Sequence, residues 1–98
     1  MCKSQIIARI IEAVVDETEV PEDLIRSGSK KVEVVDAKCI AIKIMSEKGI
    51  YPEQIARSMH ASPTSIRNLL TNYEYRIEQN KIIAIYANNI RKMLETNC

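Results

Sequence analysis

The sequence predicts an all-α fold: a compact bundle of about six helices with a helix-turn-helix at its centre. Isoleucine, valine and alanine recur at the spacing of an amphipathic helix along most of the chain. Proline and glycine fall between these segments, where they typically begin and end helices. Because 98 residues provide one hydrophobic core, we expect residues 1–98 to form a single domain.

The N-terminal part of the chain predicts one amphipathic helix and one short helix. Residues 5–15 place isoleucine and valine on one face of a helix. Residues 20–25 predict a short second helix, because Pro21 suits a first helical position and acidic residues follow it. A loop is expected at Ser27–Lys31, with Gly28 as the residue that stops the short helix.

The middle of the chain predicts the most buried helix. It runs over Glu33–Lys48 and carries apolar residues on most of its sides, which is typical of a helix surrounded by others. Gly49 follows directly and is expected to end it. A closing helix at Lys81–Glu95 has a long apolar stripe, which we interpret as core-facing rather than as a dimer face.

A helix-turn-helix is predicted between these two helices. A short helix at Pro52–Met59 precedes a tight turn, and a second helix runs over Pro63–Gln79 with Ser62 as its N-cap. Ala56 is the small residue expected where the two helices touch. His60 occupies a turn position where glycine is usual, because the backbone there tends to be left-handed. The residues expected to face the core are Ile55, Met59, Ala61, Ile66 and Leu69.

The second helix of this unit carries the predicted DNA-reading face. Its outward positions hold short polar side chains and one arginine, which suit hydrogen bonds to base edges and phosphates in a major groove. The N-terminus of the helix also offers N–H groups to a phosphate. The residues predicted to bind DNA in this unit are Ser62, Thr64, Ser65, Arg67, Asn68 and Thr71.

Charge is distributed unevenly along the chain, although the net charge is only +1. Residues 1–25 carry two bases and six acids (−4), whereas residues 26–98 carry twelve bases and seven acids (+5). This asymmetry predicts one acidic and one basic surface. We expect DNA phosphates to contact Arg26, Lys30, Lys31 and Lys38, and a solvated basic loop without a partner is the open alternative.

Other classes of function are disfavoured by the sequence. No glycine-rich phosphate loop, metal-ligand cluster or nucleophile motif is present, so we expect neither an enzyme nor a cofactor, metal or small-molecule substrate. His60 is the only histidine and has no catalytic triad around it. No apolar run reaches the about 20 residues of a membrane span. Three cysteines without a C-x-x-C pair predict a reducing cytoplasm, with Cys39 as a small core residue.

Three stretches of the chain carry a family resemblance. Asp36–Ile42 is similar to an R-x-R-Q-x-A-M motif, Ile50–Ala56 to S-L-P-E-I-G with one extra residue, and Met59–Ile66 to G-x-R-D-H-T-T-V. With the order of the predicted helices, these stretches resemble the C-terminal DNA-binding domain of the bacterial replication initiator DnaA over nearly the whole chain. The resemblance implies an all-helical fold with a basic loop before a long helix, and double-stranded DNA as the partner.

The chain departs from this family at several motif positions. Ala61, Ser62 and Pro63 stand where the family has Arg, Asp and His, which take part in contacting its cognate DNA box. Asp36 replaces a basic residue, and we expect an acid there to repel phosphate, whereas Lys38 keeps its positive charge. No G-x-x-x-x-G-K-[ST] motif of the family's ATPase domain occurs.

The leading hypothesis from the sequence is a double-stranded DNA-binding module. The second helix of the unit would enter the major groove while the basic loop contacts phosphates. The alternative is a protein-interaction domain that keeps the fold without sequence-specific DNA binding. The modest positive charge, Asp36 and the acidic residues in the segment 12–23 favour this alternative.

Overall fold

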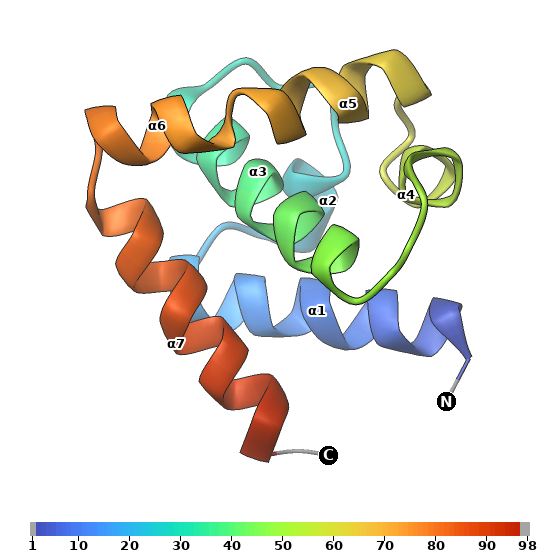
Figure 1. Ribbon diagram of the computed structural model, residues 1–98, viewed down its shortest axis with the longest axis horizontal. Coiled ribbons are helices and arrows are strands. Elements are labelled where there is room, and N and C mark those ends of the chain that lie inside the picture. Colours follow the sequence, from blue (N-terminus) through green and yellow to red (C-terminus); the bar gives the residue numbers. More distant parts are fainter. Residues whose placement is uncertain (1, 97–98) are drawn as a thin grey trace.

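Residues 2–96 are described by a computed structural model, and they form seven α-helices without a β-strand (Figure 1). The predicted all-α bundle is therefore confirmed. No helix in this range is long and apolar enough to cross a membrane. The helices are α1 (Lys3–Thr18), α2 (Glu22–Ile25), α3 (Val32–Glu47), α4 (Pro52–Ser58), α5 (Pro63–Thr71), α6 (Tyr73–Gln79) and α7 (Ile82–Thr96).

Helix α3 lies at the centre of the fold, as its apolar sequence predicts. It contacts each of the other six helices. Figure 1 shows α5 and α6 running along one side of it and α1 along the opposite side. Nine of its sixteen residues are buried, and they lie on most sides of the helix, whereas Asp36, Lys43 and Glu47 form a less buried stripe. Such a helix is stable only when its neighbours remove its apolar surface from water.

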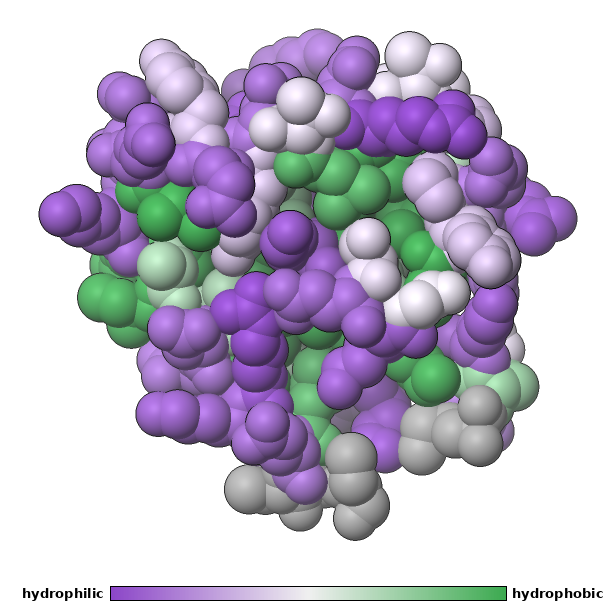
Figure 2. All heavy atoms as spheres, in the orientation of Figure 1, coloured by the Kyte–Doolittle hydropathy of each residue, from purple (hydrophilic) through white to green (hydrophobic). Residues whose placement is uncertain are grey.

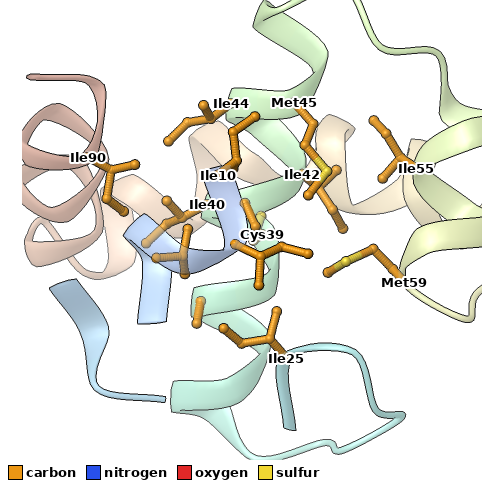
Figure 3. Packing of buried hydrophobic residues seen from close by; sticks show 14 of the residues in the cluster. Ile10, Ile25, Cys39, Ile40, Ile42, Ile44, Met45, Ile55, Met59 and Ile90 are labelled. Carbon is orange, nitrogen blue, oxygen red and sulfur yellow. The ribbon is translucent and has the colours of Figure 1, made fainter. Parts of the chain in front are cut away.

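The core around α3 is almost entirely aliphatic. Ile10 of α1, Ile40 of α3, Ile55 of α4 and Ile90 of α7 are fully buried within one continuous cluster (Figure 3). Cys39 is buried in the same cluster, which confirms its expected place in the core. On the face seen in Figure 2, hydrophilic side chains cover most of the surface, and apolar side chains remain visible where α6 meets α7.

The predicted helix Pro63–Gln79 is divided into α5 and α6 at Asn72. Asn72 is the C-cap of α5, with φ −87° and ψ 0°, so its backbone is still right-handed but lies away from ideal α-helical values. Beyond this point the Tyr73 ring is buried in the core, whereas Tyr75 is exposed. The thiol of Cys39 donates to the Leu69 carbonyl oxygen (3.4 Å) in the last turn of α5, so the core contacts the backbone beside the break.

The prediction that Gly28 stops the short helix is wrong. Helix α2 ends at Ile25, where the N–H of Arg26 donates to the Glu22 carbonyl oxygen and the N–H of Ser27 to that of Leu24. Pro21 is the N-cap of α2 rather than its first residue. Gly28 has no left-handed φ, so the local conformation does not require glycine there.

Gly49 ends α3 as predicted, and it does so in a left-handed conformation. Its φ is +85°. Its N–H donates to the Ser46 carbonyl oxygen (3.0 Å), and the N–H of Ile50 donates to that of Met45 (3.1 Å). This is the hydrogen-bond pattern of a Schellman motif, in which glycine avoids the steric cost of a Cβ atom.

The two glycines provide a matched pair of stability variants. We expect Gly49→Ala to lower the free energy of unfolding by about 1–2 kcal/mol, because an L-residue is strained at this φ. Gly28→Ala should leave it unchanged or raise it by up to about 1 kcal/mol, since a side chain there restricts only the unfolded chain. Urea unfolding monitored by circular dichroism measures both values, and equal effects of the two substitutions would contradict the assignment.

Candidate nucleic-acid interface

Helices α4 and α5 form the predicted helix-turn-helix, with residues 59–62 as the turn. Its core-facing residues lie as the sequence predicts. Ile55, Met59 and Ile66 are fully buried, and Ala61 and Leu69 are partly buried against the same cluster. The small residue Ala56 is 2% exposed. The apolar side of the helix-turn-helix therefore packs against α3, and its polar side faces solvent.

The turn between α4 and α5 contains His60 in the left-handed conformation that the sequence predicts, with φ +53°. The N–H of the next residue, Ala61, donates to the Ala56 carbonyl oxygen (2.9 Å) at the end of α4. The imidazole of His60 is exposed. A residue with a Cβ atom thus occupies a position where glycine would fit without strain.

Ser62 caps the N-terminus of α5, as predicted. Its Oγ accepts a hydrogen bond from the backbone N–H of Ser65 (3.1 Å), and the hydroxyl groups of the two serines are also 3.1 Å apart. Pro63 follows as the first residue of the helix. Because the Ser62 hydroxyl already forms the hydrogen bonds of the helix cap, it is less able to donate a hydrogen bond to a DNA phosphate.

The predicted reading face of α5 is exposed and has two sides. Thr64, Ser65, Arg67, Asn68 and Thr71 are all exposed. The Arg67 guanidinium pairs with the Glu53 carboxylate of α4 (2.8 Å), and the Thr71 hydroxyl donates to the Arg67 carbonyl oxygen (2.9 Å). Ser65 and Asn68 lie on the other side of the face, toward the basic loop.

Two of the four basic residues predicted to contact phosphates hold the loop in place instead of projecting freely. Arg26 pairs with Glu22 (3.0 Å) and donates to the Ser58 carbonyl oxygen at the end of α4 (2.6 Å). Lys38 is buried, and its ammonium group donates to the Ser27 carbonyl oxygen. Burial and, to a smaller extent, the charge of Lys30 lower the pKa of Lys38.

The other two basic residues, Lys30 and Lys31, are exposed. Within the described part of the chain, neither forms an ion pair. Lys30 and the preceding loop residues form one wall of a groove of about 570 Å³, and Ser65 and Asn68 of α5 form the opposite wall. The fold therefore places part of the basic loop beside the predicted reading face.

An ion pair that the sequence did not predict includes Arg76, one of the residues that line this groove. Arg76 of α6 pairs with Asp36 of α3 (2.9 Å), and both side chains are partly buried. The charge of Asp36, expected to repel phosphate, is thus balanced within the protein. The two residues are 40 positions apart, and no local sequence pattern links them.

Comparison with models of known protein families and with curated protein sequences finds no match to this chain. In residues 2–96, no group of three or more His, Cys, Asp or Glu side chains is placed to hold a metal ion. The candidate site consists of a polar helix face, an adjacent basic loop and the groove between them.

The left-handed turn residue gives a direct test of the unit's geometry. We expect His60→Gly to raise the free energy of unfolding by about 0.5–1 kcal/mol, because relief of left-handed strain exceeds the greater flexibility of glycine in the unfolded chain. His60→Ala keeps the Cβ atom and should bring no such gain. Chemical denaturation of both variants provides the comparison, and a glycine variant no more stable than the alanine variant would refute the left-handed turn.

Proposed function

We propose that this protein is a double-stranded DNA-binding module. Helix α5 enters the major groove with Thr64, Ser65, Arg67 and Asn68 toward the base edges, and Lys30 and Lys31 contact phosphates. The observation that carries the proposal is the groove in which the basic loop and the polar face of α5 lie side by side. The resemblance in the sequence to the replication initiator's DNA-binding domain is a second, independent reason.

The way in which the loop is held supports this proposal. A hydrogen bond from Arg26 holds the loop to the end of α4, and a hydrogen bond from Lys38 of α3 holds it to that helix. These two contacts hold the start of the loop, at Arg26 and Ser27, a few residues before the exposed lysines. Binding of a rigid duplex then requires less ordering of the loop backbone, which reduces the entropic cost of association.

A titration with fluorescent duplexes tests the proposal. The protein is added to random-sequence and initiator-box duplexes at two salt concentrations, and anisotropy reports binding. Each phosphate contact contributes about −0.9 to the slope of log affinity against log salt, so contacts from Lys30 and Lys31 give a slope near −2. A preference for the box duplex would identify base-specific contacts. Absence of binding even at low salt would reject the proposal.

Arg67 is the residue most suited to reading a guanine. We expect Arg67→Ala to weaken binding to a preferred duplex by about 1–3 kcal/mol, because a bidentate contact to guanine is lost. Lys92→Ala removes the same charge from an exposed position on α7 and serves as the control. Anisotropy titrations compare the two variants, and unchanged affinity of the Arg67 variant would remove this residue from the interface.

Substitution of Glu53, the ion-pair partner of Arg67, should strengthen DNA binding, whereas substitution of Arg67 should weaken it. Both side chains are more than half exposed, so the pair contributes little to stability. Glu53→Gln should strengthen duplex binding severalfold, because it frees the Arg67 guanidinium and removes a negative charge close to the phosphates. The same titration measures the change, with Glu95→Gln on α7 as a charge-matched control. Weaker binding of the Glu53 variant would show that the carboxylate assists the complex.

A protein-interaction domain is the second candidate function, and the pairing of the arginines favours it. Arg26, Arg67, Arg76 and Arg91 are each paired with a carboxylate of this chain. Their charges are therefore partly compensated before any phosphate approaches. A duplex must compete with these carboxylates, whereas a protein partner of mixed charge need not.

A further inference from the structure

The groove beside α5 contains the ammonium group of a largely buried lysine, Lys38, which has no carboxylate partner among the described residues. Lys38 is 9% exposed, and among the described residues only the Ser27 carbonyl oxygen is seen to accept a hydrogen bond from its Nζ. Buried charges in proteins are normally paired with an opposite charge, because a neutral acceptor does not compensate for lost hydration. Desolvation and the neighbouring Lys30 both lower the pKa of Lys38, which fits an uncompensated pair of cations.

The lining of the groove has an excess of positive charge. Lys30, Lys38 and Arg76 contribute cations, and no acidic side chain is among the lining residues that the structure describes. Asp36 pairs with Arg76, so the charges of the two lysines remain unbalanced. The rest of the lining combines neutral hydrogen-bonding groups, including those of Ser29, Ser65 and Asn68, with the apolar side chains of Val35, Ala61 and Leu69.

The size and chemistry of the groove fit a small molecule that carries an anionic group. Its volume is about 570 Å³, which lies within the range of about 300–1,000 Å³ that is usual for small-molecule sites. The imidazole of His60 is the one aromatic ring among its described lining residues, so recognition there depends on charge and hydrogen bonds more than on stacking. A phosphate group matches these donors, since it is negatively charged and accepts several hydrogen bonds.

We infer that the groove is a binding site for a small phosphorylated ligand, whose phosphate group lies between Lys30 and Lys38. Ser65 and Asn68 donate hydrogen bonds to the same ligand. Because these two residues also belong to the predicted reading face, the ligand and a DNA duplex compete for one surface. The inference goes beyond DNA binding, since a phosphorylated ligand can occupy the groove in a protein that binds no duplex.

Calorimetric titration of the full chain with inorganic pyrophosphate, at constant ionic strength, tests the site. We expect saturable binding, weakened by about tenfold or more in Lys30→Gln, because a charge-assisted hydrogen bond is lost. Lys31→Gln is the matched control: it removes the same charge one position away, and Lys31 is exposed and outside the groove lining. Absence of binding, or equal weakening in both variants, overturns the inference.

A competition experiment separates a free ligand from the phosphates of DNA, which share its chemistry. Pyrophosphate is added to a protein–duplex complex, and sodium chloride of equal ionic strength is the control. Displacement beyond that caused by salt supports a shared surface, and bound pyrophosphate without displacement overturns it. If duplexes bind and pyrophosphate does not, the ligand site is rejected and DNA binding stands. If pyrophosphate binds and duplexes do not, the ligand site stands alone.

Discussion

The need to cover α3 on most of its sides is the constraint on which the rest of the structure depends. Its buried residues face all of its neighbours, and each of the other six helices contacts it. The chain has no phenylalanine and no tryptophan, so mid-sized aliphatic side chains fill the space between the helices. Such cores lose stability when a single side chain is shortened, because neighbouring helices cannot fully close the gap.

The same helix positions both walls of the groove through two consecutive residues. Lys38 donates to the Ser27 carbonyl oxygen of the basic loop, and Cys39 donates to the Leu69 carbonyl oxygen of α5. Successive residues of an α-helix point about 100° apart, so adjacent side chains reach different neighbours. The loop and α5 are thus fixed to one rigid element, and the width of the groove is set by α3 rather than by the loop.

Local signals in the sequence are sufficient to predict most of the fold and part of the candidate site. The sequence predicts that Gly49 ends α3 and that Ser62 caps α5, because helix caps depend on a few neighbouring residues. The helix break at Asn72, the burial of Lys38 and the Arg76–Asp36 pair were not predicted. Each depends on segments that meet only in the folded chain, and the residues of that ion pair are 40 positions apart.

The paired arginines and the unpaired lysines of this surface differ in how they can bind an anion. Arg26, Arg67 and Arg76 are each held by a carboxylate, whereas Lys30 and Lys31 have no ionic partner in the described range. An ammonium group is a compact point charge, and it lacks the planar fork with which a guanidinium reads a base or grips a phosphate bidentately. The loop therefore suits attraction without sequence preference. Discrimination between anions or DNA sequences must then come from the side chains of α5, which are hydroxyl and amide groups and, for a duplex, the Arg67 guanidinium.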